Sequence, residues 1–116
     1  MNENAWNYPA AAGHTAGSDL TGFKVEALDG GIGKVGKHTE DVDAAFLVVD
    51  TGPWIFGREV LLPAGTVTRV DAVEERIHVD RTKEQIKDAP SFHSDQHLSD
   101  SSYRDLLGSY YWPPRM

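Results

Sequence analysis

Residues 23–35 read FKVEALDGGIGKV, and this stretch decides the fold. Two short apolar runs stand on either side of Asp29-Gly30-Gly31, a turn sequence whose glycines adopt positive φ angles at little steric cost. Apolar runs separated by so short a turn are typical of two antiparallel strands. We therefore predict a β-hairpin at the start of the folded region.

Four further runs follow the hairpin and have the composition of short strands. They cover residues 44–50, 58–63, 66–70 and 77–79. The first of them is almost continuously apolar, which predicts a central strand with both faces covered. Six short strands predict a mainly β fold in which the sheet curls into a small barrel, because closure hides edges that would otherwise pair between molecules.

Two helices are predicted after the strands. Thr82 and Gln85 have the spacing of a capping box, so a short helix begins there and ends before Pro90. Apolar residues at three- and four-residue intervals indicate a second, amphipathic helix, which Pro113-Pro114 ends. Those residues are Tyr103, Leu106, Leu107, Tyr110 and Tyr111.

The chain has the size and composition of one acidic domain. Its 116 residues have room for a single core, and we divide them into a flexible arm (1–17), a barrel domain (18–92) and a linker with a helical tail (93–116). Eleven Lys plus Arg against eighteen Asp plus Glu give a net charge of -7, which argues against direct binding to nucleic acid or anionic lipid. The absence of cysteine excludes disulfides, thiolate zinc sites and cysteine nucleophiles.

The hydropathy of the chain indicates where in the cell we expect the protein. No run approaches the roughly 20 apolar residues that cross a bilayer, and the first residues lack the pattern of a signal peptide. We therefore expect a cytoplasmic protein that does not insert into membranes.

Four motifs in one order carry a resemblance to a known family. They are LTGFKV at 20–25, DGGIGKV at 29–35, FLVVD at 46–50 and VLLP at 60–63. With them the chain resembles the PRC-barrel family, over residues 20–92. That family includes the cytoplasmic domain of the photosynthetic reaction-centre H subunit, the C-terminal domain of a ribosome maturation factor and small stand-alone bacterial proteins. The chain is most similar to the stand-alone actinobacterial type.

The resemblance implies a six-stranded PRC-type barrel that acts as an adaptor on a protein surface. It offers no family-wide active site, so it implies a non-enzymatic protein without a cofactor. We do not expect the reaction-centre role, because the H subunit has a membrane-spanning segment ahead of its barrel. The partner is unknown, and a general structural or stress-related role is a further alternative.

A metal site is the alternative from another functional class. His93, Asp95 and His97 alternate along a polar segment, and residues two apart in an extended chain point the same way. Two imidazoles and a carboxylate suit zinc or nickel, which makes a metal-binding protein or a metal-dependent enzyme conceivable. No supporting residues that would fix the rings are evident, so we favour solvated histidines and predict no metal.

Two other clusters favour ordinary structural interpretations. The glycine-rich residues 30–34 lack both the Walker spacing and the dinucleotide fingerprint, so we interpret them as part of the hairpin. Glu40, Asp41 and Asp43 lack the ligand alternation of a calcium-binding loop, so we interpret them as a solvated turn.

The predicted contact residues are large and apolar. Trp54, Ile55 and Phe56 occupy a loop, where they either mark a protein-binding surface or cap an end of the barrel. The tail residues either fold back on their own barrel or cross to a second copy, and we predict self-association, with a dimer favoured. The tail residues are Tyr103, Leu106, Leu107, Tyr110, Tyr111 and Trp112.

Overall fold

A computed structural model describes residues 5–13, 18–39, 45–52, 59–90, 92 and 100–112. The strands are β1 (Lys24–Ala27), β2 (Gly30–Thr39), β3 (Phe46–Asp50), β4 (Glu59–Pro63), β5 (Val67–Asp71) and β6 (Arg76–Val79). The helices are α1 (Lys83–Lys87) and α3 (Ser101–Tyr111), with short 3-10 turns η1 (Ala10–Ala12) and η2 (Ala64–Thr66). The predicted mainly β fold with six strands is confirmed.

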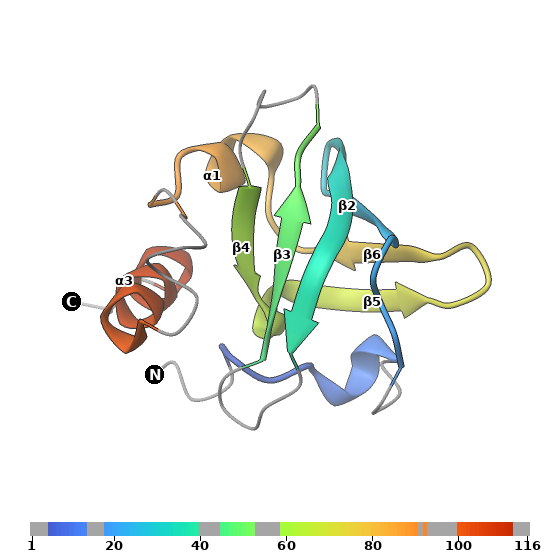
Figure 1. Ribbon diagram of the computed structural model, residues 1–116, viewed down its shortest axis with the longest axis horizontal. Coiled ribbons are helices and arrows are strands. Elements are labelled where there is room, and N and C mark those ends of the chain that lie inside the picture. Colours follow the sequence, from blue (N-terminus) through green and yellow to red (C-terminus); the bar gives the residue numbers. More distant parts are fainter. Residues whose placement is uncertain are drawn as a thin grey trace.

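The strands form one bent sheet in the order β4-β3-β2-β1-β6-β5. Neighbouring strands are antiparallel except for β1 and β6, which pair in parallel. β5 and β6 run across the direction of β2, β3 and β4, so the two parts of the sheet face each other around the core (Figure 1). The buried cluster draws side chains from all six strands.

The sheet does not close, which corrects the prediction that all backbone edges are hidden. Within the described residues, β4 and β5 share no pairing, although they follow each other along the chain. Only η2 joins them, and the Thr66 hydroxyl donates to the Pro63 carbonyl at 2.8 Å to hold this corner. The tight corner sends β5 across the end of β4, and Pro63 has no N–H to donate to a further strand.

The predicted hairpin is confirmed by the pairing of β1 with β2. Ala27 lies opposite Gly30, which leaves Leu28 and Asp29 as the two-residue loop, so Gly30 and Gly31 belong to β2 and not to the turn that the sequence predicts. Gly33 in β2 has a φ of 144°, and a Cβ atom there would lie 2.0 Å from the Asp50 carbonyl oxygen in β3. The close approach of β2 and β3 at this point therefore requires glycine.

β3 has both faces covered, as its continuous apolar run predicts. Its residues 46–49 are all buried. β3 is nevertheless second in the sheet order, not at the middle, because the parallel pairing of β1 with β6 extends the sheet on the opposite side.

The N-terminal segment differs from the flexible arm that the sequence predicts. Ala5 and Ala12 are buried, and Trp6 and Tyr8 pack against the core. The carbonyl oxygens of Ala5 and Trp6 accept hydrogen bonds from the N–H groups of Gly65 and Ala45, both at 2.8 Å. Residues 5–13 are therefore held against the sheet because they satisfy backbone donors beyond the ends of strands.

The short helix α1 begins as the capping box predicts. The Thr82 hydroxyl accepts from the Gln85 N–H at 3.1 Å, and the Thr82 N–H donates to Gln85 Oε1 at 2.9 Å. Ile86 is fully buried and attaches the helix to the core. α1 and α3 thus both pack against the core, through Ile86 in α1 and Leu107 in α3.

Candidate protein-interaction surface

Several of the predicted site residues lie outside the described residues. They are Trp54, Ile55, Phe56, His93, Asp95 and His97, together with the acidic Glu40, Asp41 and Asp43. Within the described ranges, no group of three or more His, Asp or Glu side chains is arranged to hold a metal ion. In the same ranges, no helix is long and apolar enough to cross a membrane.

The predicted tail helix forms and packs on its own barrel. Tyr103, Leu107 and Tyr111 are buried in the core cluster, and the Tyr103 hydroxyl donates to the Pro90 carbonyl at 2.9 Å. Leu106 points away from this face and is 55% exposed. The alternative of folding back, which the sequence left open, therefore accounts for five of the six tail residues, because Tyr110 and Trp112 also pack against the core.

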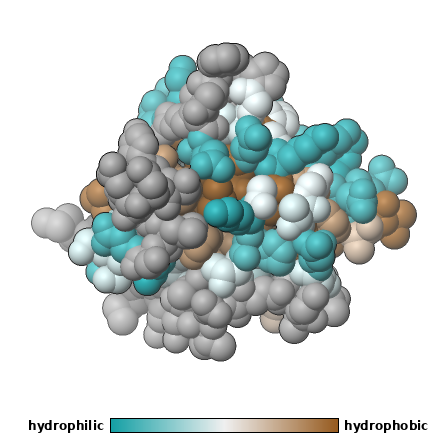
Figure 2. Space-filling model, in the orientation of Figure 1, coloured by the Kyte–Doolittle hydropathy of each residue, from teal (hydrophilic) through white to brown (hydrophobic). Residues whose placement is uncertain are grey.

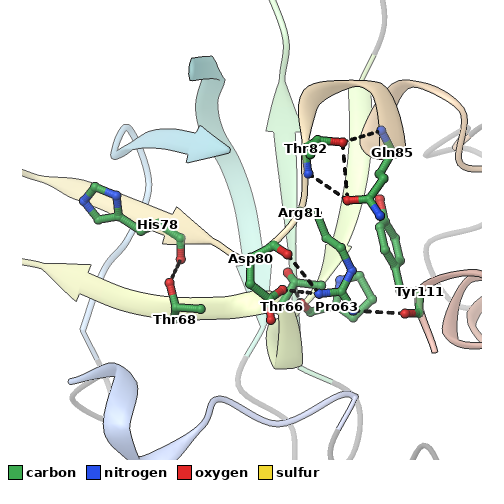
Figure 3. A network of polar contacts seen from close by, with 9 residues as sticks. All are labelled: Pro63, Thr66, Thr68, His78, Asp80, Arg81, Thr82, Gln85 and Tyr111. Atoms are coloured by element: carbon green, nitrogen blue, oxygen red, sulfur yellow. Dashed lines mark hydrogen bonds and ion pairs between the residues drawn. The ribbon is translucent and has the colours of Figure 1, made fainter. Parts of the chain in front are cut away.

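Arg81 joins the end of the last strand to the tail (Figure 3). Its guanidinium group donates to the Tyr111 carbonyl at 3.0 Å and also pairs with the Asp80 carboxylate. The same group lies 5.5 Å from the Tyr111 ring centre and 5.0 Å from that of Trp112, within the range of cation–π attraction. We call Arg81, Tyr111 and Trp112 the arginine latch. No local sequence pattern indicates this latch, because Arg81 stands directly before the residues that begin a helix.

Tyr110 adds a second polar contact between α3 and α1. Its hydroxyl donates to the Gln85 carbonyl at 2.6 Å. Desolvation raises the pKa of Tyr110 above its usual value of 10.0, and the nearby carboxylates of Asp88 and Glu84 raise it further. The neutral, hydrogen-bonding form of this phenol is therefore the one that the fold favours.

The face of the sheet that points away from the core carries charged residues in one register row, whereas Val48 and Leu61, which follow the row on the same face of β3 and β4, are buried. Figure 2 shows hydrophilic residues spread over the visible face, with hydrophobic residues between them. Strand pairing places one charged residue from every strand in the row, and paired residues share a face of the sheet. From β4 to β5 the row is Glu59, Asp50, Lys34, Lys24, Arg76 and Asp71.

The two ends of this row differ in how their charges are compensated. Arg76 forms an ion pair with Glu26 at 2.9 Å, and Asp71 forms one with Arg69 at 3.5 Å. Within the described part of the chain, Lys24, Lys34, Asp50 and Glu59 take part in no ion pair. We call these four residues the open charge row. From β4 to β1, the first two residues of the row, Glu59 and Asp50, are negatively charged. The next two, Lys34 and Lys24, are positively charged.

A hollow of about 220 Å³ adjoins the middle of the open charge row. Gly33, Lys34, Asp50, Thr51 and Gly52 line it. Asp50 Oδ1 accepts a hydrogen bond from the Gly52 N–H at 3.0 Å, which shapes the turn after β3. The predicted apolar loop follows this turn in the sequence, since Trp54 comes two residues after Gly52.

Comparison with known families decides the classification. The family model of the PRC-barrel domain matches residues 15–86, more than half of the chain. The chain belongs to the PRC-barrel family. No curated protein matches the chain.

The PRC-barrel match covers all six strands and most of α1 but ends before α3. The open charge row and the hollow therefore lie within the PRC-barrel domain, whereas Tyr111 and Trp112 of the arginine latch lie beyond the match. PRC-barrel domains are protein-interaction domains, so the shared part of this chain carries that general role.

Proposed function

We propose that this PRC-barrel protein is a non-enzymatic adaptor that binds a protein partner and associates with itself, a dimer being favoured. The observation that carries the proposal is the family match over residues 15–86, which spans the whole six-stranded sheet. The partner is a protein, and we place the adaptor in the cytoplasm.

The character of the hollow supports a binding role. Only Lys34 and Asp50 among its five lining residues are ionisable, and Asp50 already accepts a hydrogen bond from its own turn. Acid–base catalysis needs a donor and an acceptor whose environments shift their proton affinities toward the working pH. The hollow suits contact with a partner better than it suits catalysis.

The contact surface that we propose combines the loop residues with the free part of the tail. Trp54, Ile55 and Phe56, which the sequence predicts to lie in a loop, remain the main candidates, because large apolar residues in loops commonly mark a binding site. From the tail, Leu106 is the exposed apolar residue, since Tyr103, Leu107 and Tyr111 are buried in the core. Tyr110 and Trp112 are partly buried and pack against the core.

Crosslinking with mass spectrometry in the native cell tests this function. We expect wild type to capture a defined set of proteins and Trp54→Ala to lose part of that set. Val73→Ala is the matched control, because Val73 is 89% exposed in the turn between β5 and β6. Capture that is identical in all three proteins would contradict a specific adaptor and favour a general structural role.

Calorimetric titration with zinc and with nickel tests the alternative class. The adaptor is expected to show no tight stoichiometric site with either ion. A stoichiometric site in wild type that is lost in His93→Ala and in His97→Ala would contradict the proposal and favour a metal-dependent function.

A further inference from the structure

The open charge row has an order of signs that is complementary to itself. Neighbouring strands in a sheet lie roughly 4.8 Å apart, so the four residues span roughly 14 Å across β4, β3, β2 and β1. A two-fold axis that runs parallel to the strands, between β2 and β3, reverses the order of the row in a second copy. Asp50 then faces Lys34 of the other copy, and Glu59 faces Lys24 of the other copy.

We infer that the exposed part of this face, where the open charge row lies, is the contact between two copies of the chain. The inference rests on the self-association in the proposed function and specifies the surface that produces it. An isologous contact of this kind uses each pair twice, so the row supplies four ion pairs across the interface.

Repulsion between like charges makes the open charge row energetically unfavourable in the isolated chain, which supports the inference. Lys24 and Lys34 lie directly opposite each other in the register of β1 and β2, and like charges in this position repel. Both lysines are exposed, and neither forms an ion pair within the described residues, although Lys34 also lies opposite Asp50 in the register of β2 and β3. Carboxylates from a second copy would relieve this repulsion.

A second copy fits the row better than other occupants do. An acidic segment laid along the row would meet Asp50 and Glu59 after passing the lysines, and a basic segment would meet the lysines. The same argument disfavours nucleic acid, whose phosphates carry a single sign of charge. Only a partner that presents two positive charges opposite Glu59 and Asp50, and two negative charges opposite the lysines, matches all four residues. A second copy of the chain is such a partner.

Charge-swapped variants test the inference. Variant A carries Lys24→Glu and Lys34→Glu, which makes the row entirely acidic. Variant B carries Asp50→Lys and Glu59→Lys, which makes it entirely basic. We expect wild type to dimerise in sedimentation equilibrium, and each variant alone to weaken the dimer by roughly one to two orders of magnitude, because facing charges then repel. An equimolar mixture of A and B is expected to recover the dimer as a heterodimer.

The design contains its own controls. Variant B is less acidic overall than wild type, whose net charge is -7, so general repulsion between copies does not explain a loss of its dimer. Recovery in the mixture shows that both variants are folded, and circular dichroism of each variant checks this separately.

The possible results distinguish a failure of the open charge row as the dimer contact from a failure of the proposed self-association. A wild-type dimer that persists in A and in B would overturn the role of the row and leave self-association standing through another surface. Loss of the dimer in A and B without recovery in the mixture would overturn the two-fold arrangement. A monomeric wild type would overturn both the inference and the self-association, while the capture of other proteins would remain as a separate result.

Discussion

The β1–β2 hairpin and the C-terminal helix are held to the molecule in different ways. At Gly33 the hairpin is fixed by its backbone, since an added Cβ atom would lie 2.0 Å from the Asp50 carbonyl oxygen. α3 is fixed by side chains, through Leu107 in the core, the arginine latch and the Tyr110 hydroxyl. One substitution that places a Cβ atom against the neighbouring backbone is expected to destabilise the sheet strongly. The side-chain contacts of α3 can be removed one at a time, and each removal is expected to cost less. The following predictions test this difference.

The largest effect is expected for Gly33→Ala. The new methyl group would collide with the backbone of β3, and the φ of 144° is one that alanine rarely adopts. We expect a loss of roughly 3 kcal/mol or more in the free energy of unfolding, measured by urea denaturation. Gly36→Ala is the control, because its Cβ would meet only the Val48 carbonyl oxygen at 3.7 Å. Equal losses in the two variants would contradict the backbone constraint.

The next effect is expected for Leu107→Ala in α3. Leu107 is completely buried, so its truncation leaves a cavity and costs about 2–5 kcal/mol. Leu106 is one residue away in the same helix and 55% exposed, so Leu106→Ala is expected to change stability by less than about 0.5 kcal/mol. The two denaturation curves measure this contrast, and a reversed order would show that α3 packs with its other face.

A smaller effect is expected when the arginine latch is removed. Arg81→Ala deletes one hydrogen bond to Tyr111, two cation–π contacts and the partly exposed ion pair with Asp80, together about 1–2 kcal/mol. Hydrogen exchange is expected to rise in α3 and to stay unchanged in β1 and β2. Arg69→Ala is the control, since its ion pair with Asp71 is exposed and long. Faster exchange throughout the sheet would mean that the latch supports the whole fold.

The smallest effect is expected for Tyr110 at alkaline pH. Because its folded-state pKa is raised, mainly by desolvation, the stabilisation is complete below the unfolded value near 10.0 and is lost as the pH rises through the folded value. We therefore expect α3 to loosen above about pH 10, as followed by hydrogen exchange or tyrosine absorbance. Tyr110→Phe is expected to remove this dependence, and an unchanged profile in Tyr110→Phe would assign it to another group.

The parts of the fold that depend on local chemistry were predictable from the sequence. Asp29-Gly30-Gly31 indicated the hairpin, and the spacing of Thr82 and Gln85 indicated the start of α1. The apolar run of β3 predicted two covered faces. In each case the residues that decide the structure lie within a few positions of one another.

The parts that depend on distant partners were not predictable. The pairing of Lys24 with Arg76 joins strands far apart in the sequence, and no local pattern indicates a parallel neighbour. The hydrogen bond from Ala45 to Trp6 likewise has no local signal, so residues 5–13 read as an arm. The open charge row appears only once the register of four strands is known, so no local sequence pattern indicates it.

Zero-length crosslinking of lysines to carboxylates tests the proposed contact between copies most directly. An equal mixture of ¹⁴N- and ¹⁵N-labelled wild-type protein would be crosslinked with a carbodiimide and digested, and peptides that carry both labels would identify links between copies. The account predicts mixed-label links from Lys34 to Asp50 and from Lys24 to Glu59. Mixed-label links confined to other positions, such as the tail helix, would contradict it, and so would an absence of mixed-label peptides.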